Sequence, residues 1–120
     1  MLRKALVLLG TASVAGAIAL VPTAAQAAPA GCQSGALCGF TGYYFSGSVG
    51  NLHGNNTNLL YSPWTSVESV YNDGTMCSVN IYTGTSYSGS NVTIPIGYQY
   101  GDLQNDAPAY YHHIQSNHWC

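Results

Sequence analysis

One sequence pattern occurs twice in this chain, and it limits the fold more than any other feature. Residues 40–48 (FTGYYFSGS) and residues 82–90 (YTGTSYSGS) are identical at five of nine positions, at an offset of 42 residues. Two further positions keep an aromatic ring in both copies. The repeat indicates two successive structural units of about 40 residues, over about 36–73 and about 77–120.

Each copy places two aromatic rings around a short segment that is rich in glycine and serine. This segment is too short for a straight strand, so we expect a hairpin that folds back over its sheet, clamped by the second ring. The glycine after that ring is expected at φ > 0, where a Cβ atom is costly. The residues of the pattern are Phe40, Phe45 and Gly47 in the first unit and Tyr82, Tyr87 and Gly89 in the second.

Beyond the first 27 residues, the chain has short apolar or aromatic runs and no helical periodicity. Such runs favour an all-β fold, a sandwich of about eight short strands in a single domain. Asn72-Asp73-Gly74 predicts a turn between the units, and Ser116-Asn117 predicts another. The closing strands would carry Ser69-Val70 and His113-Ile114. The runs expected as strands are 36–40, 58–61, 66–71, 78–82, 91–96, 98–100 and 110–114.

The N-terminal segment has the composition of an export signal. Arg3 and Lys4 precede an almost wholly apolar stretch at 5–21, and Ala25-Gln26-Ala27 has the form of a cleavage site. A membrane anchor is the alternative, but about 17 residues are short for a span. We expect residues 1–27 to be a signal peptide and residues 28–120 to form one secreted, extracellular domain.

Positive charge is confined to that N-terminal segment. Residues 28–120 contain no Lys or Arg, and phosphate binding to nucleic acid or docking on an anionic membrane needs such residues. The sequence therefore predicts no nucleic-acid partner and no membrane partner. The acidic residues, which give this part a net charge of −4 with His neutral, are Glu68, Asp73, Asp102 and Asp106.

The cysteines form an even set in a short exported chain, which is typical of disulfides. They are Cys32, Cys38, Cys77 and Cys120. Three pairings are open, and proximity in sequence favours Cys32 with Cys38, which leaves Cys77 with Cys120. Their spacings match no zinc pattern, so no metal ligand is assigned.

The aromatic-x4-aromatic-x-Gly pattern resembles the Greek-key motif of βγ-crystallins, which occurs in pairs in each domain. Residues 32–40 (CQSGALCGF) also resemble the beginning of actinobacterial peptidase inhibitors of family I36. The resemblance covers about 90 residues. It implies a small secreted βγ-crystallin domain with two Greek-key motifs, which inhibits an extracellular protease.

The chain departs from the relatives that bind calcium. Their motif, N/D-N/D-x-x-S/T-S, is reduced to its final serine in residues 64–69, and residues 108–113 take its place in the second unit. Calcium prefers clustered oxygen ligands, and only Glu68 supplies a carboxylate there. We expect no cofactor, and the alternative left open is a weak, displaced calcium site near Asn105-Asp106.

No enzyme motif is present: the sequence has neither G-x-S-x-G nor H-E-x-x-H, and its few carboxylates are scattered. His112, His113 and His118 cluster in sequence, but adjacent strand residues face opposite sides of a sheet. We interpret them as polar strand residues, one of which bonds the folded hairpin in place of a crystallin serine. The chain is therefore expected not to be an enzyme.

The function expected from the resemblance is peptidase inhibition by an exposed loop, with the protein acting as a monomer. Without Lys or Arg no side chain can pair with the aspartate of a trypsin-like pocket, so metalloproteases or subtilisin- and chymotrypsin-like proteases are expected. Some relatives carry a small second disulfide loop, whereas Cys77 and Cys120 enclose a long one, so the inhibitory loop stays unknown. Candidate loops are Leu52–Trp64 and Ile94–Asp102.

Two alternatives remain open for the same scaffold. An uncharged surface with exposed Tyr43-Tyr44 suits an antimicrobial, killer-toxin-like or cell-wall-binding protein. A calcium-binding structural crystallin is the other alternative. Missing basic charge counts against attack on membranes, since such agents are mostly cationic.

Overall fold

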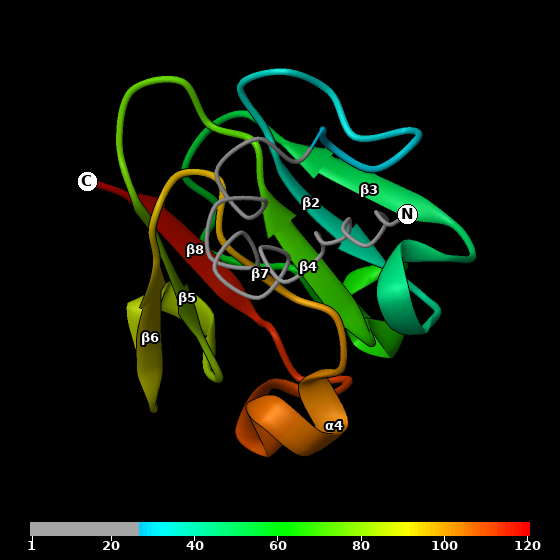
Figure 1. Ribbon diagram of the computed structural model, residues 1–120. Coiled ribbons are helices and arrows are strands. Elements are labelled where there is room, and N and C mark those ends of the chain that lie inside the picture. Colours follow the sequence, from blue (N-terminus) through cyan, green and yellow to red (C-terminus); the bar gives the residue numbers. More distant parts are fainter. Residues whose placement is uncertain (1–26) are drawn as a thin grey trace, which may run out of the picture.

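Two antiparallel sheets build the domain in the computed structural model, which describes residues 27–120 (Figure 1). The first sheet has the order β3-β2-β4-β7 and the second β6-β5-β8. Their strands are β2 (Leu37–Phe40), β3 (Val49–Leu52), β4 (Ser69–Asn72), β5 (Val79–Tyr82), β6 (Asn91–Ile94), β7 (Gln99–Tyr100) and β8 (Ser116–Trp119). The short helices are α4 (Leu103–Asp106) and the 3-10 turns η1 (Tyr43–Phe45), η2 (Trp64–Ser66), η3 (Thr85–Tyr87) and η4 (Pro108–Tyr110).

The predicted signal peptide lies almost wholly in residues 1–26, outside the described part of the chain. Among residues 27–120, no helix has the length and apolar character needed to cross a membrane.

The two halves exchange one segment each, which gives the Greek-key arrangement. β7 belongs to the second half but pairs with β4 of the first half. In return, Asn56 of the first half forms an isolated antiparallel bridge with Asn117 at the edge of the second sheet. Seven strands are therefore present in residues 27–120, where about eight were predicted, and the Asn56–Asn117 pairing is a single bridge outside them.

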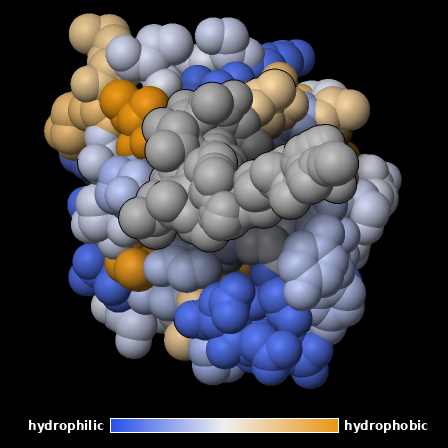
Figure 2. All heavy atoms as spheres, in the orientation of Figure 1, coloured by the Kyte–Doolittle hydropathy of each residue, from blue (hydrophilic) through white to orange (hydrophobic). Residues whose placement is uncertain are grey.

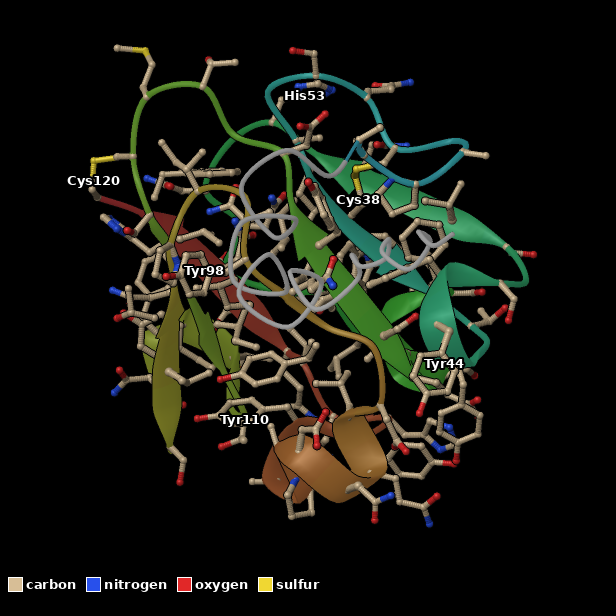
Figure 3. All side chains as sticks on the ribbon, viewed as in Figure 1. Cys38, Tyr44, His53, Tyr98, Tyr110 and Cys120 are labelled. Atoms are coloured by element: carbon tan, nitrogen blue, oxygen red, sulfur yellow. A yellow bond between two sulfur atoms is a disulfide. The ribbon has the colours of Figure 1, made fainter. Side chains whose placement is uncertain are left out.

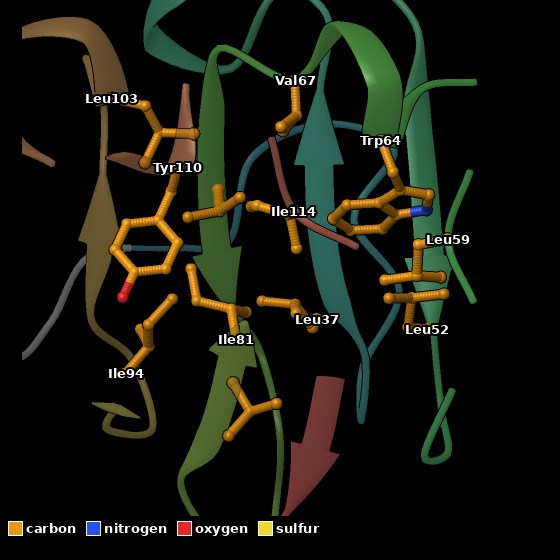
Figure 4. Packing of buried hydrophobic residues seen from close by; sticks show 12 residues of the cluster. Leu37, Leu52, Leu59, Trp64, Val67, Ile81, Ile94, Leu103, Tyr110 and Ile114 are labelled. Carbon is orange, nitrogen blue, oxygen red and sulfur yellow. The ribbon is translucent and has the colours of Figure 1, made fainter. Parts of the chain in front are cut away.

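A buried apolar cluster between the sheets draws on both halves (Figure 4). Leu37 and Val70 come from the first sheet, and Ile81 from the second, and all three are fully buried. Removing such a side chain costs about 2–5 kcal/mol, so each half depends on the other for its core. The two units fold as one layered structure, which confirms the all-β class.

A buried serine fastens the folded hairpin in each half. In the first half, Ser69 Oγ donates to the carbonyl of Gly42 at 2.7 Å and accepts from the N–H of Phe45 at 3.0 Å. The ring of Phe45 meets that of Phe40 at a centroid distance of 5.6 Å. Gly47, two residues on, has φ +80°, a conformation that favours glycine.

The second half repeats this lock with the same geometry. Ser116 Oγ donates to the carbonyl of Gly84 at 2.6 Å and accepts from the N–H of Tyr87 at 3.0 Å. Tyr82 and Tyr87 have ring centroids 5.6 Å apart, and Gly89 has φ +79°. The bonding role that we had expected from a histidine thus belongs to Ser116.

The last strand was placed too early by the sequence interpretation. Residues 110–114 form the end of η4 and a turn, while β8 begins at Ser116, where a turn was predicted. The reason is an insertion. Leu59 and Leu103 are structural equivalents, because each donates its N–H to the residue before the locking serine. Ser69 follows its leucine by 10 residues, whereas Ser116 follows by 13.

Two other strand predictions also differ from the structure. Residues 58–61 form no strand, because Leu60 and Tyr61 are exposed on a loop, and β3 was not predicted at all. β3 (VGNL) contains a glycine and an asparagine, which weaken the alternating pattern on which strand prediction depends.

Both disulfides join the cysteines that proximity in sequence favoured. Cys32 pairs with Cys38 at a Cα–Cα distance of 5.6 Å, and Cys77 pairs with Cys120 at 5.8 Å. The second bridge ties the segment between β4 and β5 to the end of β8. It therefore connects the middle of the chain to its C-terminal residue.

Candidate functional site

Asn72, the last residue of β4, is fully buried and holds the turn between β6 and β7. Its N–H donates to the carbonyl of Tyr98 at 3.0 Å, and its carbonyl accepts from the N–H of Gly97 at 2.8 Å. Its side chain donates to the carbonyl of Ile94 at 2.8 Å and accepts from the N–H of Gly74 at 2.7 Å. One buried residue thus fixes two segments that are distant in sequence.

The held turn spans Pro95–Tyr98 and lies inside the predicted loop Ile94–Asp102. The N–H of Tyr98 donates to the carbonyl of Pro95 at 3.0 Å, and Gly97 has φ +79°, which a turn of this kind requires. Ile96 is 44% exposed and Tyr98 is 64% exposed. Figure 3 shows Tyr98 at the border of the two sheets. A rigid backbone therefore presents two large apolar side chains to solvent.

The second segment is the linker Asp73–Ser78 between β4 and β5. The N–H of Asp73 donates to the carbonyl of Ala36 at 2.9 Å, and its carbonyl accepts from the N–H of Gly35 at 2.7 Å. A Cβ atom on Gly74 would lie 2.7 Å from the ring of Trp119. The first part of the linker is therefore fixed against the end of the sandwich.

The second part of the linker is fixed by the disulfide of Cys77. Its partner Cys120 donates its N–H to the carbonyl of Ser78 at 3.2 Å. Between these anchors, the side chain of Met76 is 88% exposed, more than any other large apolar side chain in residues 27–120. We call the turn Pro95–Tyr98 and the linker Asp73–Ser78 together the Asn72 face.

The Asn72 face lies at one end of the molecule. The linker and the β6–β7 turn share the upper left of Figure 1, near the C-terminus. In the same orientation, Figure 2 shows apolar residues gathered at the upper left. An open cavity of about 420 Å³ lies beside Met76, and its lining includes His53, Asn55 and Trp119. Exposed apolar side chains next to a concavity are typical of a protein contact surface.

The other predicted loop, Leu52–Trp64, is held differently. Leu59 and Pro63 are buried, and between them Leu60 is 53% exposed and Tyr61 is 50% exposed. Trp64 donates its N–H to the carbonyl of Tyr61 at 2.9 Å. This loop is also ordered by hydrogen bonds, but no disulfide closes it.

The opposite end of the domain carries a polar and aromatic network. His112 Nε2 lies 3.0 Å from Glu68 Oε2, and the hydroxyl of Tyr111 donates to the same oxygen at 3.3 Å. The hydroxyls of Tyr43 and Tyr111 lie 3.2 Å apart, within hydrogen-bond distance. The bond with Tyr43, partial burial and the nearby Glu68 carboxylate raise the pKa of Tyr111 well above its usual value. The network joins η1 to the segment after η4.

The three histidines of the sequence analysis have separate surroundings. His112 pairs with Glu68, His113 is exposed, and the ring of His118 on β8 packs edge-on against Tyr87 at 5.0 Å. In residues 27–120 no three His, Cys, Asp or Glu side chains gather closely enough to hold a metal ion.

The positions of the calcium motif need one correction. Because Ser116 is the equivalent of Ser69, the second segment to compare with residues 64–69 is 111–116 rather than 108–113. Neither segment has Asn or Asp at its first two positions. Trp64, at the first of them, is buried against Gly39 and Gly50. Near Asn105-Asp106, the Asp102 carboxylate accepts bonds from Asn105 and thereby caps α4.

A sequence model of peptidase inhibitor family I36 matches residues 25–94. The chain belongs to peptidase inhibitor family I36. The match includes the first unit, the whole linker and the strands β5 and β6. No curated protein matches the sequence.

Solved structures with the same fold are βγ-crystallin domains. One, from work on the evolution of the eye lens βγ-crystallin domain fold, has a TM-score of 0.66 and 18% identity, covering 78% of this chain and 93% of its own. A βγ-crystallin from Ciona intestinalis has a TM-score of 0.59 and 14% identity, with coverages of 72% and 100%. IPSE/alpha-1 from Schistosoma mansoni eggs has a TM-score of 0.58 and 18% identity, and the match covers 73% of this chain and 87% of its own.

The sequence interpretation missed the roles of Asn72 and Met76. Asn72 was recognised only as part of a turn, whereas it ends a strand and bonds four other residues. Met76 was not noted. Its position directly before a cysteine, between two units, was a usable signal, because a disulfide fixes the backbone of its neighbours.

Proposed function

We propose that the protein is secreted and inhibits an extracellular peptidase through the Asn72 face. Membership of family I36 supports a peptidase partner. The observation that carries the choice of surface is the set of four hydrogen bonds from buried Asn72, which fix the turn and the linker together. Of the two candidate loops, Ile94–Asp102 is therefore the one that we assign to the contact.

Rigidity favours inhibition because association costs free energy for every side chain and loop that must be ordered. Here that ordering is done during folding. Asn72 fixes the turn, and the Cys77–Cys120 disulfide fixes the linker. Exposed Ile96 and Tyr98 then offer apolar surface of the kind that dominates protein interfaces.

The charge of the chain narrows the class of target. Residues 28–120 have no Lys or Arg, so a trypsin-like pocket with an aspartate at its base would receive no cation. Pockets that accept apolar or aromatic side chains fit this surface. We therefore propose metalloproteases and subtilisin- or chymotrypsin-like enzymes as targets.

Secretion and the lack of catalysis belong to the same proposal. Two disulfides persist in an oxidising compartment, and residues 1–27 have the pattern of an export signal. We propose that residues 28–120 act as a monomeric binding domain rather than as an enzyme.

A panel of purified peptidases tests the proposal. The mature protein would be titrated against a thermolysin-like, a subtilisin-like, a chymotrypsin-like and a trypsin-like enzyme, with residual activity as the readout. Inhibition of at least one of the first three, with trypsin unaffected, is expected. No inhibition of any of the first three at micromolar protein would refute it, and strong inhibition of trypsin would refute the target class.

A further inference from the structure

We propose that Met76 is the side chain that enters the substrate-binding pocket of the target peptidase. The inference rests on the proposed function and names the specificity-determining residue of its surface. The linker residues on either side of Met76 would lie along the enzyme's cleft.

Exposure singles out Met76 first. Its side chain is 88% exposed, compared with 71% for Tyr44 and 64% for Tyr98. Burying a large apolar side chain that is otherwise in water is favourable, in proportion to the apolar area removed from water. An unbranched thioether with three rotatable bonds also adapts to pockets of differing shape. A docking enzyme would therefore gain much of its apolar contact from this one residue.

The backbone around Met76 is available for pairing. Among the residues that the structure describes, no hydrogen bond engages the N–H or carbonyl of Thr75 or Met76. These two residues belong to no helix or strand. Thr75 and Met76 lie on a bend, which turns the chain outward at this point. Their free backbone groups can therefore bond to an enzyme that docks on this end of the domain.

The anchors of the linker limit how far it can move. On one side, Asp73 bonds to Ala36 and Gly35, and Gly74 bonds to Asn72. On the other side, Cys77 is covalently bound to Cys120. Only Thr75 and Met76 lie between these fixed points. This spacing limits the movement of the backbone at Met76, so that mainly the side chain remains to be ordered on binding.

The charge near Met76 agrees with an apolar pocket. Asp73 is the nearest charged residue in sequence, and residues 27–120 contain no Lys or Arg. The adjoining cavity is lined mainly by small and apolar groups, with Trp119 among them. A pocket that requires a positive or negative side chain finds none at this position.

A pair of glutamate variants tests the inference against a peptidase that the wild-type protein inhibits. Met76→Glu places a charge in the proposed contact, and Leu60→Glu is a matched change on an exposed apolar residue of the other loop. Both sites face solvent, so both variants should fold, with thermal unfolding as the check. We expect inhibition to weaken about 100-fold or more for Met76→Glu and less than about threefold for Leu60→Glu.

Oxidation supplies an independent test, because Met76 is the only methionine in residues 27–120 and the cysteines there are all paired. Hydrogen peroxide transfers one oxygen atom to the thioether sulfur, which gives the sulfoxide and water. The sulfur loses two electrons and the peroxide gains them. The product is polar, so peroxide should weaken inhibition by the wild-type protein, and Met76→Leu should be insensitive to it.

The outcomes separate the two proposals. If the wild-type protein inhibits no peptidase, the proposed function fails and this inference fails with it. If the wild-type protein inhibits but Met76→Glu inhibits equally well, only the assignment of Met76 is overturned. Equal loss of inhibition by peroxide in wild type and Met76→Leu would overturn it as well.

Discussion

Two buried asparagines show how the halves of this domain differ. Asn72 ends the closing strand of the first half and holds the turn of the second half at Ile94 and Gly97. Asn117 lies in the closing strand of the second half and holds the first-half loop at Gly54 and Asn56. Each half thus fixes a loop of the other half with one asparagine that is fully buried.

The loops that these asparagines hold are unlike each other. Asn72 also bonds the linker at Gly74, so its two loops form one surface with exposed Tyr98 and Met76. Asn117 bonds only the Gly54–Asn56 region, which contains no large exposed apolar side chain. The exposed apolar residues of that loop, Leu60 and Tyr61, lie outside the segment that Asn117 holds. This difference is the reason for assigning the contact to one loop.

Removal of the disulfides should have the largest effect and should differ between the halves. The chain-entropy model gives about 4 kcal/mol for a loop closed over a separation of 43 residues, as in Cys77–Cys120, and about 2 kcal/mol for Cys32–Cys38. We expect the double alanine variant that lacks the Cys77–Cys120 disulfide to have a lower free energy of unfolding in urea than the variant that lacks Cys32–Cys38. The reverse order would show that the linker gains no stability from its tether.

The two buried serines that fasten the folded hairpins should contribute equally to the free energy of unfolding if the two halves are structurally equivalent. Ser69→Ala and Ser116→Ala each leave a backbone N–H and a carbonyl without their partner. Each change should destabilise the domain by about 1–3 kcal/mol. Measured unfolding free energies that differ by more than this range would mean that the two hairpins are not equivalent supports.

The two asparagines should match in stability and differ in function. Asn72→Ala and Asn117→Ala each remove two side-chain hydrogen bonds in a buried site, at about 1–3 kcal/mol. Asn72→Ala should also weaken inhibition by about tenfold, because the turn and the linker must then be ordered on binding. Asn117→Ala should change inhibition by less than about threefold. Equal losses of inhibition would remove the distinction between the loops.

Alkaline pH should produce the smallest effect. Burial, with a smaller contribution from Asp73, raises the pKa of Tyr71, and the bond with Tyr43 is the main cause for Tyr111. A tyrosine whose pKa is raised by folding stabilises the fold below its unfolded pKa of about 10, and this stability is lost as the pH rises. Unfolding free energies from pH 9 to 11.5 should fall, and Tyr111→Phe should reduce the slope. An unchanged slope would contradict the role of Tyr111.

Much of the fold followed from local patterns. The aromatic and glycine spacing predicted both hairpins, and the closeness of Cys32 to Cys38 favoured their disulfide, because these features act over a few residues. The pairing of Cys77 with Cys120, 43 residues apart, followed only because these two cysteines were left. The last strand could not be placed in this way. β8 reads Ser-Asn-His-Trp, which resembles a turn, and its position depends on the three residues inserted after Leu103.

The candidate site depended even more on tertiary structure. Ile94–Asp102 was predicted as a loop, but its rigidity comes from Asn72, more than 20 residues earlier in sequence. The exposure of Met76 also depends on how the linker crosses the end of the sandwich. Neither the rigidity of the loop nor the exposure of Met76 leaves a periodic pattern in the sequence.

The central claim is that the Asn72 face, and not the loop Leu52–Trp64, contacts the peptidase. Its most direct test compares the inhibition constants of two double variants against one enzyme that the wild-type protein inhibits. The first variant combines Ile96→Ser and Tyr98→Ser, and the second combines Leu60→Ser and Tyr61→Ser. We predict at least about 100-fold weaker inhibition for the first and less than about threefold change for the second. Loss of inhibition in the second variant alone would contradict the account.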